Sequence, residues 1–145
     1  MVQVYGWLLH QGRVLVQDTG SGFNLPGGRP EPEDADLVAT LRREAREESQ
    51  VTVAETRYLG YERVVRSGQP RALVRMVGVI DEFLPRHPDP DGGRLLGRLL
   101  CPLSEATHLL DWGTSGQDQS RAAAVEAEQG WGISVPTSAA ALLVV

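Results

Sequence analysis

Residues 25–51 read LPGGRPEPEDADLVATLRREAREESQV, and the second half of this stretch has the pattern of an amphipathic helix. Prolines at positions 26, 30 and 32 keep the first part out of regular structure. The carboxylate of Asp34 or Asp36 can cap the first turn of a helix that ends near Ser49. The apolar stripe that this helix would turn toward a core consists of Val38, Leu41 and Ala45.

Three carboxylates lie on one face of the predicted helix. Glu44, Glu47 and Glu48 are spaced i, i+3 and i+4, so their side chains share a face and repel one another unless a cation lies between them. Mg²⁺ prefers such oxygen ligands and commonly bridges protein carboxylates to substrate phosphates. A solvated surface with an Arg43–Glu47 ion pair would also explain the helix by itself. The Gly27-Gly28 pair upstream favours the metal site, because glycine backbone can approach a ligand closely or supply a carbonyl to the metal.

Arg43 lies on an adjoining flank of the same helix. From there it can pair with a carboxylate of the preceding loop and hold the site in shape. That loop offers three carboxylates within reach, those of Glu31, Glu33 and Asp34. The residue pattern leaves the choice among these partners open.

The rest of the chain is predicted to form strands and two further helices. Strands are expected over residues 2–9, 13–17, 58–66, 71–83 and 98–101, and helices over residues 104–110, with Ser104 as its cap, and from 115 or 117 to 129. The tail at 138–145 could add an edge strand or fray. This order of elements predicts one α+β or layered α/β domain over residues 1–145.

The composition excludes several classes of protein. The 145 residues are 41% apolar and 23% charged, as in an ordinary compact domain. The net charge of -5 and the lack of a basic block argue against a nucleic-acid-binding module. No apolar run approaches the ~20 residues of a membrane span, and no signal peptide is evident, so we expect a cytoplasmic protein. Cys101 lies in an apolar run and is interpreted as a buried residue, not a nucleophile.

The stretch at residues 28–51 resembles the Nudix box, the signature of Nudix hydrolases. That box reads Gly, five residues, Glu, seven residues, then Arg-Glu-apolar-any-Glu-Glu-any-Gly-apolar. Gly28 fits the opening position, Arg43-Glu44-Ala45-Arg46-Glu47-Glu48 fits the Arg-Glu core without a gap, and Val51 fits the last apolar position. The lead-in Leu25-Pro26-Gly27 is also similar to that of the family.

Three positions depart from this pattern. Asp34 stands in the place of the first Glu, with eight residues and not seven before Arg43. Glu33 occupies a position where the family often has Gly, and Gln50 replaces the closing Gly. The extra residue lies near the junction of loop and helix, where an insertion is tolerated most easily. All three carboxylates of the Arg-Glu core are present.

The resemblance implies a Nudix fold, which is a mixed β-sheet sandwiched between α-helices. It also implies hydrolysis of a nucleoside diphosphate linked to another group X, with Mg²⁺ or Mn²⁺ neutralising charge on the phosphate oxygens and orienting the attacking water. The metal ligands implied are Glu44, Glu47, Glu48 and the backbone carbonyl of Gly28. Arg43 would orient the carboxylates.

The general base and the substrate contacts are harder to assign. A Glu of the box could be the base, and Asp91 is a further candidate because it lies in a long loop after a strand, although Asp and Pro in such loops commonly only form turns. Arg29, and Arg71 or Arg75, could bind phosphates, or could be ordinary surface residues. Aromatic residues that could stack on a base, but are also explained by core packing, are Tyr5, Trp7, Phe23 and Phe83.

Two functions from different classes therefore stay open. The first is an Mg²⁺-dependent pyrophosphohydrolase, and the second is a Nudix-fold module that senses a nucleotide without cleaving it. Three carboxylates held together are costly without a cation, which favours the enzyme. In either case the expected partner is a small-molecule nucleotide, and the protein is expected to be a monomer or a homodimer. The box does not distinguish nucleoside triphosphates from sugar-nucleotides, ADP-ribose or dinucleoside polyphosphates.

Overall fold

The computed structural model describes residues 1–135 and 142–144. Its elements in chain order are β1 (Val2–His10), β2 (Arg13–Asp18), β3 (Phe23–Asn24), β4 (Gly27–Gly28), α1 (Leu37–Ser49), β5 (Val51–Arg66), β6 (Gln69–Phe83), β7 (Gly97–Cys101), α2 (Leu103–Leu110), α3 (Gly113–Trp131) and β8 (Leu142–Val144). The strands form one 8-stranded sheet in the order β5-β6-β1-β2-β7-β8, with β3 beside β2 and β4 beside β1. The sheet is mixed because β1 and β6 run parallel, whereas the other pairs are antiparallel.

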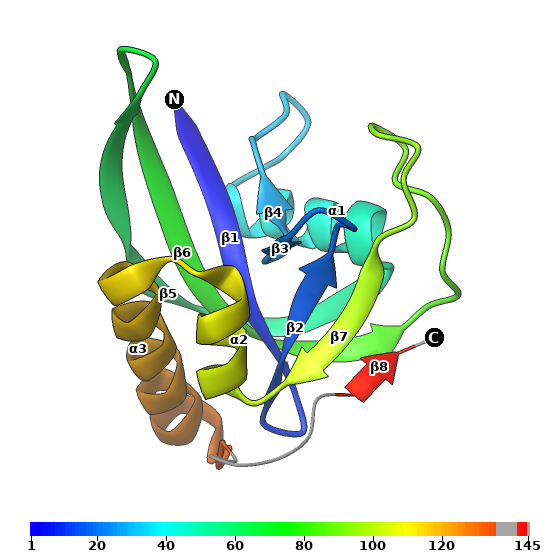
Figure 1. Ribbon diagram of the computed structural model, residues 1–145, viewed down its shortest axis with the longest axis vertical. Helices are drawn as coiled ribbons and strands as arrows, with labels where there is room; N and C mark the ends of the chain where they lie inside the picture. The colour runs from blue at the N-terminus through cyan, green and yellow to red at the C-terminus, as the bar shows by residue number, and fades with distance from the viewer. Residues whose placement is uncertain (136–141, 145) are drawn as a thin grey trace.

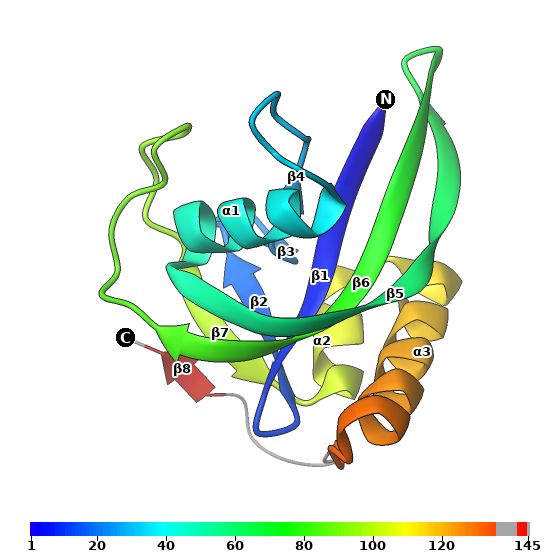
Figure 2. The ribbon, with the colours of Figure 1, turned by 180° about the vertical axis from the view of Figure 1, so that it is seen from behind.

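The three helices cover both faces of this sheet. Helix α1 lies on one face, and α2 and α3 lie on the other (Figures 1 and 2). Successive side chains of β1 point to opposite faces, as expected for a strand. Trp7 and Leu9 therefore join the core under α2 and α3, while Val4 and Leu8 join the core under α1. The predicted mixed sheet between helices, in a single domain, is confirmed.

Helix α1 begins and ends as its sequence suggests. The Asp36 carboxylate caps the first turn by accepting a hydrogen bond of 2.8 Å from the backbone N–H of Ala39. Leu41 and Ala45 are fully buried against the sheet. At the other end Gln50 adopts the left-handed conformation, with φ of 51°, and its N–H bonds to the carbonyls of the last turn. Gln50 thus performs the C-capping that glycine more often provides.

Several expectations about element boundaries were wrong. Helix α2 begins at Leu103, with Pro102 and not Ser104 at its N-cap. Helix α3 begins at Gly113, before either predicted start. Gly27 and Gly28, expected in an irregular loop, form the short strand β4. In the tail, residues 142–144 form an edge strand along β7, whereas 138–141 and 145 lie outside the described residues. Among the helices that the structure describes, none is long and apolar enough to cross a membrane.

Gly27 is required by the close approach of β4 to β1. A Cβ atom at this position would lie 2.1 Å from the carbonyl oxygen of Val4 and 2.7 Å from the Cα of Tyr5. We expect Gly27→Ala to lower the free energy of unfolding by about 1–3 kcal/mol, because the backbone of β4 must move away from its partner. Thermal denaturation measures the loss, with Gly22→Ala as a control in open space. Equal melting temperatures for the two variants would show that β4 does not pack tightly on β1.

Candidate active site

Arg43 joins the loop after β4 to helix α1. Its Nε donates to Asp34 Oδ1 at 3.0 Å and its Nη2 donates to Asp34 Oδ2 at 3.0 Å, so the pair is bidentate. Nη2 also donates to the carbonyl of Arg29 at 3.0 Å. Of the other two predicted partners, Glu31 lies 3.4 Å from Nη1, and Glu33 is absent from the contacts of Arg43 in the described chain.

Asp34 is the anchor of this loop. Its side chain is only 6% exposed, and its Oδ2 also accepts hydrogen bonds from the Glu31 N–H and the Thr40 hydroxyl, both at 2.9 Å. The hydrogen bonds from Arg43 hold the pKa of the Asp34 carboxyl well below its ordinary value, with the backbone N–H of Glu31 as the next cause. Asp34 is therefore ionised throughout the physiological range and keeps loop and helix together.

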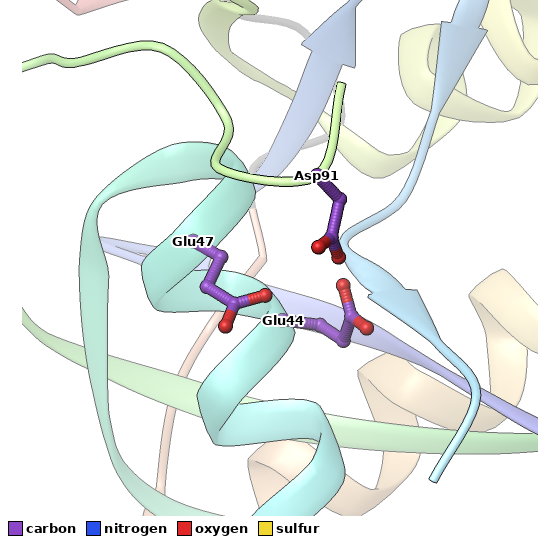
Figure 3. Close-up of side chains that lie close together, drawn as sticks. All are labelled: Glu44, Glu47 and Asp91. Carbon is purple, nitrogen blue, oxygen red and sulfur yellow. The ribbon is translucent and has the colours of Figure 1, made fainter. Parts of the chain in front are cut away.

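The opposite side of the Arg43 guanidinium contacts the helix carboxylates. Nη1 donates to Glu44 Oε1 at 3.0 Å and to Glu47 Oε2 at 3.3 Å. Asp91, from the loop between β6 and β7, approaches the same two residues (Figure 3). One carboxylate oxygen from each of Glu44, Glu47 and Asp91 lies within 4.8 Å of the other two. The structure thus brings together two predicted metal ligands and the predicted candidate base, which are far apart in sequence.

Glu48, the third predicted ligand, lies outside that group of three. Its Oε1 accepts hydrogen bonds from the Gly27 N–H at 3.0 Å and from Gln17 Nε2 at 3.2 Å. Gln17 itself is fully buried and also donates to the hydroxyl of Ser49. Sequence reasoning missed Gln17, whose only signal is a polar side chain at the end of an apolar strand. Glu48 is therefore a link between α1, β2 and β4.

Burial makes the helix carboxylates costly to ionise. Desolvation raises the pKa of Glu48 to about 8 and that of Glu44 to about 7, and it also raises the pKa of Glu47. For Glu44, the positive charge of Arg43 opposes this shift, but burial outweighs it. A divalent cation beside these oxygens would favour their ionised forms.

Gly28 lies directly against the carboxylates. A Cβ atom at this position would be 2.7 Å from both Cδ and Oε1 of Glu44, so any larger residue would occupy the space of that carboxylate. The Glu44 side chain is 12% exposed and has little room to move aside. The glycine that opens the predicted motif therefore leaves the space that the Glu44 carboxylate occupies.

Arg75 is a buried residue, which corrects its interpretation as an ordinary surface arginine. The residue is 6% exposed, and its guanidinium lies between two aromatic rings, 5.0 Å from the centroid of Tyr5 and 4.9 Å from that of Trp112. Burial lowers the pKa of Arg75, and the proximity of Tyr5 opposes this shift. Arg75 lines a cleft of about 520 Å³, a size suited to a small ligand. Arg71 does not line this cleft.

The pairing of strands β1 and β4 connects the cleft with the helix carboxylates. Tyr5, in the cleft wall, pairs with Gly27 across β1 and β4, and the Gly27 N–H holds Glu48. Phe23, one of the aromatic residues considered both for stacking on a base and for core packing, also lines the cleft. Trp112, at the N-cap of α3, lines the cleft as well. No pattern in the sequence connects Trp112 with Arg75, because the two residues meet only when α2 and α3 pack on the sheet.

The raised pKa values predict how the metal-free protein responds to pH. The folded state retains protons on Glu44 and Glu48 that an unfolded chain, with a carboxyl pKa near 4.5, has already released. Stability therefore falls as pH rises from about 5 to 8. Asp34 does not oppose this trend, since its lowered pKa acts only at more acidic pH. We expect the melting temperature in EDTA to decrease across this window.

Mg²⁺ should flatten that decrease, because the cation stabilises the ionised carboxylates that burial destabilises. Thermal denaturation at several pH values, with EDTA and with Mg²⁺, measures both slopes. Glu48→Gln should make the melting temperature in EDTA depend less steeply on pH. Identical slopes with and without Mg²⁺ would contradict a cation at these carboxylates.

Comparisons with known proteins bear on this arrangement. The sequence model of the NUDIX domain family matches residues 3–122. A solved structure of the MutT protein from Bacillus halodurans is similar, with 17% identity and a TM-score of 0.62, over 81% of this chain and 78% of that one. A NUDIX hydrolase from Nitrosomonas europaea has 14% identity and a TM-score of 0.63, over 94% of this chain and 92% of that one. An ADP compounds hydrolase has 14% identity and a TM-score of 0.68, over 90% of this chain and 74% of that one. The comparison with curated proteins gave no match.

Proposed function

Because this chain belongs to the Nudix hydrolase family and is a pyrophosphohydrolase, we propose that it cleaves a nucleoside diphosphate linked to a group X with the help of Mg²⁺ or Mn²⁺. The observation that carries the metal dependence is the convergence of Glu44, Glu47 and Asp91 within 4.8 Å. Hard oxygen donors in this number suit Mg²⁺, which keeps several waters and binds substrate phosphates at its remaining positions.

The ligands that we propose are Glu44, Glu47 and Glu48 with the backbone carbonyl of Gly28. Glu44 and Glu47 are supported by their common approach to Asp91, and Gly28 by its contact with the Glu44 carboxylate. Glu48 is supported by its buried carboxylate, whose raised pKa a cation would lower. When bound, the metal ion would neutralise charge on the phosphate oxygens and orient the attacking water.

The other residues of the site are proposed to position groups and to move a proton. Arg43 keeps the Glu44 and Glu47 carboxylates in place through Nη1 while its remaining nitrogens are fixed by Asp34. Asp91 is exposed and borders the carboxylates from a loop, so it can accept the proton of the attacking water. Arg29 is exposed beside Gly28, where its side chain can reach a substrate phosphate.

A panel of nucleotides tests this function. It contains nucleoside triphosphates and diphosphates, sugar-nucleotides, ADP-ribose and dinucleoside polyphosphates, each with Mg²⁺, with Mn²⁺ and with EDTA. Release of phosphate, pyrophosphate or nucleoside monophosphate that requires the metal supports the proposal and identifies X. No release from any member, together with metal-dependent stabilisation by a nucleotide, would instead indicate a sensor that binds without hydrolysis.

A further inference from the structure

The floor of the cleft beside the carboxylates is made by one face of three neighbouring strands. Arg75 of β6 is the register partner of Tyr5 on β1, and Leu73 of β6 is the partner of Glu62 on β5. Since alternate residues of a strand share a face, Glu62, Leu73 and Arg75 lie on the same side of the sheet. All of them line the cleft, and Trp112 covers it from the junction of α2 and α3. The cleft is therefore built from rigid elements, not from loops alone.

Arg75 has hydrogen-bonding capacity that the protein does not use. Its Nε and Nη1 are buried and have no hydrogen-bond partner among the residues that the structure describes. The rings of Tyr5 and Trp112 hold the guanidinium by cation–π contacts, which fix its plane without using its N–H groups. A guanidinium only donates hydrogen bonds, and buried donors without partners are costly. An occupant of the cleft must therefore offer an acceptor to Arg75.

Glu62 provides a hydrogen-bond acceptor on the same floor of the cleft. Glu62 lines the cleft, and the negative charge of its carboxylate acts on Arg75. The two side chains nevertheless form no ion pair with each other in the described part of the chain. Arg66 also lines the cleft, so a bare phosphate or carboxylate could satisfy Arg75, but such a group has no N–H to donate to Glu62. A group with an acceptor next to a donor satisfies both residues.

We infer that this cleft selects nucleotides whose base has a lactam edge, in which a carbonyl oxygen lies next to a ring N–H. Arg75 donates to the carbonyl, and Glu62 accepts from the N–H. Hypoxanthine, guanine, uracil and thymine have this edge. Adenine and cytosine have the reverse arrangement, so their amino group would face Arg75 and their ring nitrogen lone pair would face Glu62. The inference rests on the proposed function, since it takes the substrate to be a nucleotide.

Binding without turnover tests the inference. Isothermal titration calorimetry in EDTA compares two pairs of nucleotides that differ at this edge of the base. The first pair is inosine 5′-monophosphate and adenosine 5′-monophosphate, and the second pair is uridine 5′-monophosphate and cytidine 5′-monophosphate. We expect the wild-type protein to prefer the lactam member of each pair about tenfold or more, roughly the effect of one hydrogen bond. Arg75→Gln and Glu62→Gln should each remove most of this preference. Arg63→Gln, on β5 but on the opposite, exposed face, should keep it.

Three results would overturn the inference. The first is equal affinity of the wild-type protein for both members of each pair, or no binding of any of the four. The second is a loss of affinity in Arg75→Gln that is the same for all four nucleotides, which would place their shared phosphate and not the base on Arg75. The third is an unchanged preference in Glu62→Gln. Because EDTA removes the metal, a failed hydrolysis panel leaves this measurement interpretable, and the panel likewise does not depend on base preference.

Discussion

Replacing Glu47 by Gln is expected to lower metal-dependent turnover on the order of a hundredfold or more while the fold is retained. Mutation of residues that merely hydrogen-bond to metal ligands already lowers metal affinity or activity about 10–100-fold. The neutral amide of Gln goes further, because it removes a charge from the group of carboxylates itself. Glu47 is 27% exposed, and Arg43 keeps its bidentate contact with Asp34, so the loop and helix stay joined. Initial rates over a range of Mg²⁺ concentrations measure the effect.

The matched control for this variant is Glu33→Gln. It removes the same charge from an exposed position in the preceding loop, outside the contacts described for Arg43. We expect this control to retain the wild-type rate and metal dependence. A wild-type rate in Glu47→Gln itself would refute the assignment of Glu47 as a ligand, whatever the control shows.

The second large effect is expected in Arg43→Ala, on stability. The substitution leaves the Asp34 carboxylate, 6% exposed, without its cationic partner and leaves Glu44 and Glu47 unneutralised. Breaking a fully buried pair costs about 3–5 kcal/mol, and because the Arg43 side chain is 18% exposed we expect the lower end, about 3 kcal/mol. For a chain of this length the melting temperature should fall by about 6–12 °C.

Chemical denaturation with a parallel thermal scan measures this loss. Arg46→Ala is the control, since it removes an exposed arginine from the same helix and should change the free energy of unfolding by less than about 1 kcal/mol. Arg43→Lys should lie between wild type and Arg43→Ala, because an ammonium keeps the charge but not the fork that grips Asp34. A loss in Arg43→Ala no greater than in Arg46→Ala would mean that Arg43 is only a surface ion-pair member.

Helix α1 could be predicted because the sequence features that define it, its cap and its apolar stripe, are local. Capping by Asp34 or Asp36 and the burial of Leu41 and Ala45 follow from spacing within a few residues, and the structure has Asp36 as the cap. The choice of Asp34 as the partner of Arg43 could not be made, because it depends on how the loop turns back after Pro30 and Pro32. That path is set by contacts of the folded loop and not by residue types.

The parts of the candidate site that come from distant segments of the chain were the least predictable. Asp91 reaches Glu44 and Glu47 from a loop more than forty positions away, and nothing in its local sequence distinguishes it from a turn residue. Arg75 was thought to lie at the surface because arginine rarely lies in a core without a partner. Its burial depends on Tyr5 and Trp112, which are more than one hundred positions apart and meet only through tertiary packing.

The parallel pairing of β1 with β6 has a consequence for how this protein is made. Residues Val2 to Leu9 of the first strand find their partners at Ala72 to Val79, so the centre of the sheet cannot close until more than half of the chain exists. Such distant pairing slows folding, because a long loop must be ordered before the contact forms. During synthesis the early hairpin of β1 and β2 therefore emerges with both outer edges uncovered, because β1 later pairs with β6 and β2 with β7. That interval, before β6 leaves the ribosome, is when the nascent chain is most exposed to aggregation and most in need of a chaperone.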